Sequence, residues 1–422
     1  MSVGHRMGEA TRAVVDEPRT GSPPDTGRAI RLAVIVTDLR TGGAETFLEK
    51  LLPRLPRQIQ PHVLSLRSQG EIGPRLQAAG VPVEAFGLSG PRSLVAFMRL
   101  VRRLRQLDPH VAQTFLYHGD LIGGLAARIA SIGVVAWNIR NAGSAWHTMR
   151  WPTRAVIRAC ALLSGRIPDR IVCCSETAAG HHVRAGYCAD RIVVLPNGVD
   201  LSRFAPDPTA RRWACEALDV RPDTPLLGHF GRLDPQKDQA GFLAAFARVR
   251  RSFPDAVAIM VGAGLESTSD FASRVAELGV PASAVRFLGR RDDVARLMAA
   301  CDVVVSSSIA EAFPNVVAEA MSCGVPCVAT DVGESARIVG STGRIVPPGD
   351  PESLARACLE TLALPAPERH ALGLLGRQRI AETYDIDAVA LRYAEFYEAL
   401  MPSGGTDGTL VSTGPASAQQ QA

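Results

Sequence analysis

Residues 226–252 read LLGHFGRLDPQKDQAGFLAAFARVRRS. The first five are mostly apolar and predict a buried strand, Gly231 begins a turn, and residues 237–252 repeat apolar side chains at the period of a helix. Parallel strands need a crossover connection, which is usually a helix packed on the sheet. The stretch therefore predicts one strand–turn–helix unit of an α/β protein.

The same alternation extends in both directions through most of the 422 residues. The other expected strands are residues 32–36, 61–66, 81–86, 111–114, 134–137, 170–173, 192–195, 257–261, 285–287, 303–306, 326–329 and 344–346. The other expected helices are residues 44–55, 94–107, 120–130, 155–163, 176–185, 271–278, 292–299, 316–323, 351–362 and 386–400. This pattern predicts parallel sheets with crossover helices.

The alternation breaks at residues 196–200, which read PNGVD and predict a turn. A Pro-rich polar segment follows to about residue 224, and we interpret it as a linker with a short helix at residues 211–217. The length suits two domains, which we place at residues 29–198 and 199–384. Two Rossmann-like parallel sheets facing each other would enclose a deep cleft at the carboxyl ends of their strands.

The two ends of the chain lack this alternation. Residues 1–28 are rich in Gly, Pro and Thr, residues 403–422 are rich in Ser, Gly and Gln, and we expect both to be disordered. We expect neither a secretory signal nor a membrane span. Nine scattered cysteines are typical of the reduced thiols of a cytoplasmic protein.

The net charge of +4 argues against a dedicated nucleic-acid binder, but the charge is unevenly distributed. Between Arg31 and Arg191 there are 21 basic and 10 acidic residues, whereas between Asp200 and Glu398 there are 21 basic and 27 acidic residues. The basic first half suits an anionic membrane surface or a phosphate-bearing acceptor. An ordinary solvated surface is an equally open interpretation.

The expected helix at residues 94–107 is the strongest candidate for such a membrane contact. It places Leu94, Phe97, Val101 and Leu104 on one face and arginines elsewhere. This pattern fits a basic helix at the inner face of the cell membrane, or an ordinary crossover helix whose apolar side faces the core. We favour the crossover helix.

The first candidate site segment begins directly after the strand at residues 226–230. Gly231, Arg232 and Lys237 lie across a turn that opens a helix, so a guanidinium and an ammonium can reach one diphosphate. Of the 46 basic residues only Lys50 and Lys237 are lysine, which indicates a demand for a compact charge at position 237. Solvated charges at a helix start are the plainer alternative.

The second segment is Glu311-Ala312-Phe313-Pro314-Asn315-Val316-Val317-Ala318-Glu319. Pro314-Asn315 would start a helix between the two acids, with the amides of Asn315, Val316 and Val317 facing an anion. Glu311 would then lie near a sugar and Glu319 near a ribose diol, whose two hydroxyls a carboxylate can accept. The plainer alternative is two unrelated acids near a helix N-terminus.

Two further features are weaker signals. Gly42-Gly43, after the first strand, would let a phosphate or sugar approach the backbone closely. His118 follows a strand at a cleft-facing loop position, although a loop histidine is more often structural. Gly262 and Gly264 resemble part of a dinucleotide fingerprint, but the third glycine is missing, and we interpret them as a tight turn.

With these residues in place, the chain resembles the family-4 retaining glycosyltransferases of the GT-B architecture over most of residues 30–400. Glu311 and Glu319 resemble that family's E-x7-E motif, and Gly231-Arg232 with Lys237 resembles its G-R-x4-K segment. Gly42-Gly43 resembles its glycine loop, His118 falls where the family commonly has a cleft histidine, and residues 196–200 resemble its interdomain phrase.

The resemblance implies a UDP-sugar or GDP-sugar donor in the second domain, an acceptor in the first, and no cofactor or essential metal. It also implies that a last helix, residues 385–401, crosses back onto the first domain, and that Leu288 lies beside the nucleotide base. Arg232 and Lys237 would neutralise the departing diphosphate, Glu311 would hold the transferred sugar, Glu319 the ribose, and His118 the sugar from the opposite domain. The donor-binding set would comprise Gly42, Gly43, Gly231, Leu288, Phe313, Pro314, Asn315, Val316, Val317 and Glu319.

Other functions of a two-domain α/β protein remain open. A nucleotide-sugar epimerase shares the architecture but needs acid and base groups on both sides of the sugar. A nicotinamide-dependent oxidoreductase needs the three-glycine dinucleotide fingerprint, which is missing here. A sugar-nucleotide binder without activity would not need all four charged residues, Arg232, Lys237, Glu311 and Glu319. A glycan or lipid-linked acceptor, as in cell-envelope polysaccharide biosynthesis, is suggested only by the basic first domain. The sugar, the base, the acceptor and the linkage are not determined by the sequence.

Overall fold

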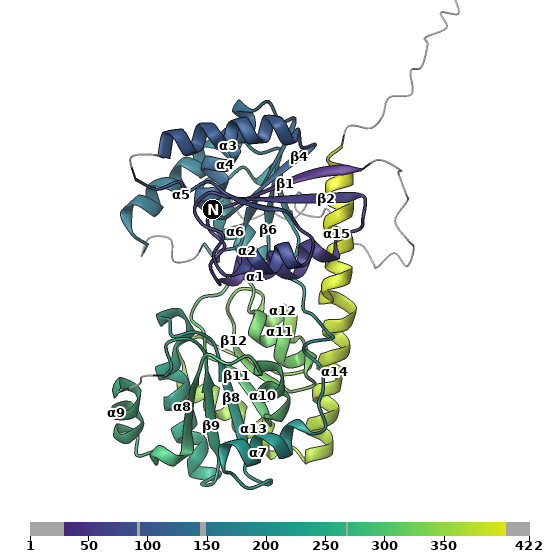
Figure 1. The fold of residues 1–422 in the computed structure, drawn as a ribbon. Coiled ribbons are helices and arrows are strands. Elements are labelled where there is room, and N and C mark those ends of the chain that lie inside the picture. Colours follow the sequence, from purple (N-terminus) through teal and green to yellow (C-terminus); the bar gives the residue numbers. More distant parts are fainter. Residues whose placement is uncertain (1–28, 91–92, 144–148, 267–268, 402–422) are drawn as a thin grey trace, which may run out of the picture.

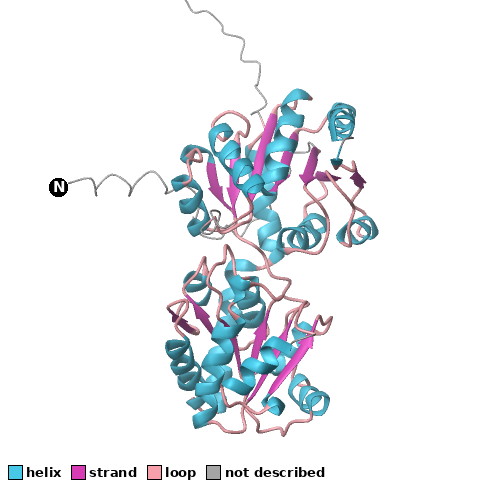
Figure 2. Cartoon of the chain, turned by 90° about the vertical axis from the view of Figure 1, so that its left-hand side faces the viewer, coloured by secondary structure: helices cyan, strands magenta, loops and turns pink. Residues whose placement is uncertain are grey.

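The structure is a computed structural model that describes residues 29–90, 93–143, 149–266 and 269–401. It contains two parallel sheets, each covered by helices on both faces (Figures 1 and 2). The expected pair of Rossmann-like parallel-sheet domains is therefore confirmed. The expected disordered ends at residues 1–28 and 403–422 lie outside the described residues.

The first sheet has seven strands in the order β3-β2-β1-β4-β5-β6-β7, all paired in parallel. Its strands are β1 Ile30–Val36, β2 Ile59–Ser65, β3 Val83–Ala85, β4 Val111–Phe115, β5 Val134–Ile139, β6 Arg170–Cys173 and β7 Ile192–Val194. Its helices are α1 Gly43–Leu51, α2 Ile72–Ala78, α3 Ser93–Leu107, α4 Leu116–Ile129, α5 Trp151–Leu163 and α6 Glu176–Arg184.

The second sheet has six parallel strands in the order β10-β9-β8-β11-β12-β13. Its strands are β8 Leu226–Phe230, β9 Val257–Val261, β10 Val285–Gly289, β11 Val303–Ser306, β12 Cys327–Thr330 and β13 Arg344–Val346. The helices after the first domain are α7 Ala210–Leu218, α8 Gln239–Ser252, α9 Ser269–Glu277, α10 Val294–Ala300, α11 Asn315–Ser322, α12 Ser335–Val339, α13 Pro351–Ala363, α14 Ala366–Tyr384 and α15 Ile386–Ala399.

Each sheet buries two apolar layers. In the first domain, α1, α2 and α15 cover one face, and α3, α4 and α5 cover the other. In the second domain, α8 and α13 pack on one face, and α10, α11 and α12 on the other. None of the helices in the described part of the chain combines the length and apolarity that a bilayer crossing requires.

The last two helices run along the side of both domains (Figure 1). α14 packs on α11 of the second domain, and α15 returns to the first. Tyr393 and Tyr397 of α15 are buried there, and the Tyr397 hydroxyl donates to Gln113 Oε1 of β4 over 2.5 Å. The aromatic side chains of α15 thus complete the core of a domain to which they do not belong in sequence.

Two local expectations were wrong. α4 begins at Leu116, so His118 lies in the first turn of a helix and not in a loop; Leu116 itself has a φ of 66°, which nothing in its side chain favours. Leu94 is 72% exposed, because α3 buries Ala96, Leu100, Val101 and Leu104. At about 100° per residue, position 94 points away from that face.

Candidate active site

A cavity of about 410 Å³ lies where the two sheets face each other at the carboxyl ends of their strands. Both domains line it. The residues around it are Thr41, Gly42, Gly43, Thr46, Phe47, Lys50, Gly198, Gly231, Arg232, Lys237, Ala263, Arg290, Asn315 and Glu319. Seven of the expected site residues are therefore brought together here: Gly42, Gly43, Gly231, Arg232, Lys237, Asn315 and Glu319.

The first domain contributes one face of α1. Gly43, Thr46, Phe47 and Lys50 recur at helical spacing and line the cavity together. Gly42 is extended and α1 has no side-chain N-cap, but the Glu45 carboxylate folds back over the first turn, where its Oε2 lies in the space that a β-carbon of Gly42 would take. A β-carbon added at Gly43 would meet open space, so a ligand can approach the backbone there.

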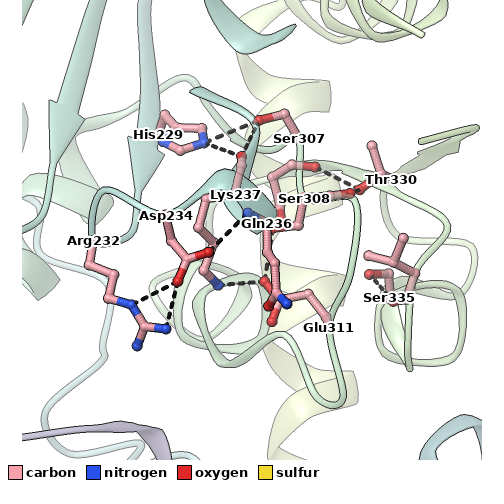
Figure 3. A network of polar contacts seen from close by, with 12 residues as sticks. His229, Arg232, Asp234, Gln236, Lys237, Ser307, Ser308, Glu311, Thr330 and Ser335 are labelled. Carbon is pink, nitrogen blue, oxygen red and sulfur yellow. Dashed lines mark hydrogen bonds and ion pairs between the residues drawn. The ribbon is translucent and has the colours of Figure 1, made fainter. Parts of the chain in front are cut away.

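The second domain contributes Lys237, which lies in a 3₁₀ turn, Pro235–Lys237, directly before α8. The carboxylate of Asp234 caps this turn by accepting the amide of Gln236 over 2.9 Å. Lys237 Nζ lies 2.5 Å from Glu311 Oε1, and Ser308 Oγ donates to the same oxygen over 2.8 Å (Figure 3). The Lys237–Glu311 pair, about one-fifth exposed or less, is the centre of this network.

A layer of buried polar groups fixes the pair from behind (Figure 3). Ser307 Oγ donates to the carbonyls of Lys237 and Asp238, each over 2.9 Å. His229 Nε2 lies 3.2 Å from Ser307 Oγ; because that hydroxyl already donates, the imidazole N–H must be the donor. Burial lowers the pKa of His229 to about 4, so the ring is neutral at pH 7.

Arg232 is held differently. Its guanidinium forms an ion pair with Asp234 over 2.7 Å, and its side chain is 63% exposed at the rim of the cavity. Partial burial acts to raise the pKa of Asp234, but the amide of Gln236 and the guanidinium of Arg232 outweigh it, so the pKa is lower than usual. Arg232 is thus a cation on the rim whose present partner is a neighbour in sequence.

Gly262 explains how the turn after β9 lies against this segment. A β-carbon at Gly262 would overlap the backbone of Gly231, at a φ of 157°. Gly264 likewise has a φ of 88°, in the left-handed region that favours glycine. These glycines serve close packing of two loops beside the cavity.

Glu319 lies one turn inside α11 and pairs across the domains with Lys50 of α1, Nζ to Oε1 3.0 Å. Both side chains are less than one-fifth exposed. The chain's two lysines therefore each pair with one glutamate of the Glu311–Glu319 segment. The scarcity of lysine drew attention to Lys50 in the sequence but did not identify its partner.

Other expected site residues lie elsewhere. Phe313 is buried, and its ring packs on Tyr384 with centroids 5.5 Å apart, while Val317 is in the same core. The partly buried side chains of Leu288 and Val316 also pack against that core. His118 is half-buried on α4 and outside the cavity lining; burial, then the charge of Arg67, lower its pKa.

The amides at the start of α11 differ from expectation. Asn315 N donates to Phe313 O over 2.9 Å, and Val317 N donates to Pro314 O over 3.0 Å. Pro314, with a ψ of 81°, bends the chain so tightly that these amides turn back on the loop. Two of the three amides expected to face an anion are therefore already used, and the Asn315 side chain accepts from Asn197 Nδ2 over 2.8 Å.

Three residues that line the cavity were not identified from the sequence: Thr46, Phe47 and Arg290. Arg290 lies just beyond β10 and also approaches Glu71 of the first domain at 3.8 Å. No spacing pattern marked it among 44 arginines. Together with Lys50, Lys237 and Arg232, it gives the cavity four cationic side chains, which suit an anionic ligand such as a diphosphate.

Two protein-family models match this chain. The model described as Glycosyltransferase Family 4 matches residues 41–203, and the model described as Glycosyl transferases group 1 matches residues 224–363. The boundary between them falls in the linker before β8. Each model covers most of one of the two domains.

Similar curated proteins include two bacterial enzymes. A GDP-mannose-dependent alpha-(1-6)-phosphatidylinositol monomannoside mannosyltransferase of Mycolicibacterium smegmatis is 28% identical, over 84% of this chain and 94% of that protein. A UDP-Gal:alpha-D-GlcNAc-diphosphoundecaprenol alpha-1,3-galactosyltransferase of Escherichia coli is 25% identical, over 61% of this chain and 67% of that protein.

Solved structures agree on the fold. Anabaena Alr3699/HepE, in complex with UDP-glucose, superposes with a TM-score of 0.77 over 88% of this chain and 100% of that one, at 23% identity. WaaG, a glycosyltransferase involved in lipopolysaccharide biosynthesis, gives a TM-score of 0.67 over 89% of this chain and 100% of that one, at 17% identity.

Proposed function

The chain belongs to the family-4 glycosyltransferases of the GT-B architecture, and we propose that it transfers a hexosyl group, with retention of configuration, from a nucleoside-diphosphate sugar to a glycan or lipid-linked acceptor. The observation that carries the proposal is the single cavity lined by Arg232, Lys237 and Glu319, with Glu311 bonded to Lys237 at its edge. A cationic wall and two carboxylates match a diphosphate joined to a sugar and a ribose.

Lys237 and Arg232 receive the diphosphate in this proposal. Both are already paired with carboxylates, so donor binding must replace or share those partners. For Arg232 the exchange is easy, because an exposed ion pair contributes only about 0–1 kcal/mol. For Lys237, the ammonium has three donors and can keep Glu311 while it contacts a phosphate oxygen.

The carboxylates hold the two sugars. Glu311, oriented by Lys237 and Ser308, accepts hydroxyls of the transferred hexose. Glu319 accepts the ribose diol, for which it must turn from Lys50 or share it. The N-terminal turn of α1 at Gly42-Gly43 approaches the donor from the other domain. His118, which does not line the cavity, reaches the hexose when domain closure brings α4 inward.

The transfer step needs no added base. The acceptor hydroxyl oxygen bonds to the anomeric carbon on the face from which the diphosphate departs, the bond from that carbon to the phosphate oxygen breaks, and the leaving phosphate oxygen takes the acceptor's proton. The charge that develops on the diphosphate is stabilised by Lys237 and Arg232, in the role that a metal ion has elsewhere. Domain closure excludes water from the step.

The names of two relatives support a lipid-linked acceptor, because one acts on a diphosphoundecaprenol-linked sugar and the other on a phosphatidylinositol monomannoside. The basic first domain supports the same class. A cytoplasmic location is supported by nine free cysteines, eight of them buried. Cell-envelope polysaccharide biosynthesis is the corresponding role.

The test is transfer of label from UDP- and GDP-hexoses, chosen by a thermal-shift screen of nucleoside diphosphates, to polyprenyl-diphosphate-linked and phosphatidylinositol-linked sugars. We expect free nucleoside diphosphate, a labelled acceptor with the donor's anomeric configuration by NMR, and unchanged turnover in EDTA. Conversion of the donor to another nucleotide sugar would indicate an epimerase, and binding without turnover a silent binder; either result contradicts the proposal.

A further inference from the structure

Large exposed apolar side chains gather on one face of the first domain, formed by α3, α4 and α5 and called here the α3–α5 face. α3 and α5 both pack beside α4 on the same side of the sheet. Figure 1 shows α3 on the side of the first domain that is farthest from the second domain. Seven of the twelve large exposed apolar side chains of the described residues lie on these helices: Leu94, Val95, Met98, Leu125, Ile129, Trp151 and Leu162.

The exposed apolar side chains of the α3–α5 face lie on the solvent-facing side of each helix, opposite the side that packs on the core. On α5, Trp151 and Leu162 are each 78% exposed and share one line with Ala155 and Arg158. The buried residues of that helix, Ile157, Cys160 and Ala161, face the other way. The apolar residues of the outer side are therefore not needed to bury the sheet.

α3 has the same character with a sharper division. Leu94, Val95 and Met98 are exposed in its first half, at 72%, 63% and 53%. Arg99 and Arg102 are exposed farther along the same side. The outer side of the helix thus passes from apolar to cationic along its length.

The face contains no exposed acidic side chain on its helices. α3 and α5 have no Asp or Glu, and α4 has only Asp120, which is 1% exposed. Between residues 93 and 170 there are eleven arginines and three acids, and the two acids outside the helices, Asp108 and Asp169, form ion pairs with Arg31 and Arg128. The face is therefore complementary to a negatively charged surface.

We propose that the α3–α5 face docks on an anionic lipid bilayer, with the apolar side chains in the interfacial region and the arginines on lipid phosphates. The α3–α5 face combines exposed apolar side chains with arginines, whose methylene groups can lie on apolar surface while their guanidinium groups reach lipid phosphates. A bilayer can bind both kinds of side chain, because apolar groups can enter the interfacial region while guanidinium groups stay at the level of the lipid phosphates. An acidic protein partner is the alternative that the test must separate.

The position of the face suits the proposed function, on which this step rests. α3 and α5 each follow a strand of one parallel sheet, so their N-terminal ends lie toward the edge at which the strands end. The cavity opens at the same edge. Trp151, at the start of α5, would therefore touch the membrane on the side toward the cleft, whereas α3 would touch it farther from the second domain (Figure 1).

The experiment is co-sedimentation of the full chain with vesicles of phosphatidylcholine alone or with 30% phosphatidylglycerol, without donor or acceptor. We expect binding to the anionic vesicles only, falling steeply between low and high salt. Trp151→Ser with Leu162→Ser, and separately Arg99→Gln with Arg102→Gln, should each weaken binding, the latter by about fivefold per arginine. Leu374→Ser with Leu375→Ser on α14, apolar residues of the second domain that are 43% and 55% exposed, is the control.

Absence of binding to anionic vesicles at low salt overturns the proposal. The α3–α5 face would then be assigned to an acidic protein partner. Binding that is unaffected by both sets of variants, or is lost equally in the control, also overturns it. The vesicle assay does not depend on turnover. A protein that binds vesicles but transfers no sugar would therefore contradict the proposed function and leave the membrane-docking proposal intact.

Discussion

Lys50 and Lys237 pair with Glu319 and Glu311 from opposite sides of the cavity. An ammonium is a compact charge that can move between oxygen partners, whereas the guanidinium fork favours a fixed bidentate pairing. In a chain with 44 arginines, we interpret lysine at these two positions as suited to carboxylates that the proposed donor would displace or share. Arginine suffices at the rim, where Arg232 is mostly exposed.

Lys237→Ala should reduce turnover about a hundredfold, which corresponds to the ~3 kcal/mol of a charge contact made in the transition state. Arg232→Ala should reduce it by at least a similar factor. The measurement is initial rate of nucleoside diphosphate release at saturating donor, with unfolding curves to establish that each variant is folded. Lys237→Arg keeps the charge and is the matched control; turnover of Lys237→Ala close to that of the wild type removes the leaving-group role.

His229 should make the second domain sensitive to acid. Its pKa is about 4 in the folded state and about 6.5 unfolded, so its contribution to stability is complete above pH 6.5 and is lost as the pH falls toward 4. At pH 4.5 the loss amounts to about 2–3 kcal/mol.

Urea unfolding of the wild type and of His229→Gln at pH 7 and 4.5 measures this loss. The variant should start less stable and lose about 2–3 kcal/mol less on acidification. Exposed His370→Gln is the control. Equal losses in the wild type and in His229→Gln would show that the imidazole is not the titrating group.

At the scale of elements, α14 illustrates how a helix approaches its neighbour through glycine. Gly373 lies against the turn after α11, and a β-carbon there would overlap the carbonyl oxygen of Gly324. Gly376, one turn along, is also buried, but its β-carbon would only make ordinary contacts of 3.5 Å with Met321 and Thr342. The helical pattern did not reveal which glycine is a close contact.

Gly373→Ala should therefore destabilise the protein by about 1–3 kcal/mol, because backbone must shift. Gly376→Ala should be neutral or stabilising by about 0.5–1 kcal/mol, because alanine loses less backbone entropy in a helix. Chemical denaturation of both variants checks the contrast. If Gly373→Ala is as stable as Gly376→Ala, α14 and α11 are not packed as closely as the structure has them.

At the scale of the molecule, Glu334 joins the two domains. Its carboxylate, on the loop before α12, accepts the amide of Glu176 over 2.8 Å and that of Thr177 over 3.4 Å at the start of α6 in the first domain. Ser175 Oγ accepts the next amide, that of Ala178, as the N-cap of the same helix. The helix end is thus capped partly by its own domain and partly by the other.

Glu334→Ala should expose these amides and favour an open arrangement of the domains. Hydrogen bonds to a charged acceptor contribute about 1.5–3 kcal/mol each, so exchange of the Glu176 and Thr177 amides should accelerate at least tenfold. Hydrogen-exchange mass spectrometry of that peptide, with small-angle scattering for domain separation, measures both effects. Glu334→Gln keeps an oxygen acceptor and should be intermediate; unchanged protection in Glu334→Ala argues against the interdomain cap.

The sequence by itself determined the two sheets, since each strand and most helices are marked by local periodicity that neighbours in sequence impose. It also predicted candidate site residues in two short segments. Arg232 and Lys237 lie in one segment, and Glu311 and Glu319 lie in the other. Tertiary structure alone decided that Lys50 meets Glu319, 269 positions away, that Glu334 caps α6, and that the expected anion-facing amides of Asn315 and Val317 turn inward. Such contacts depend on how two domains pack against each other, and the spacing of residues along one strand or helix carries no information about that.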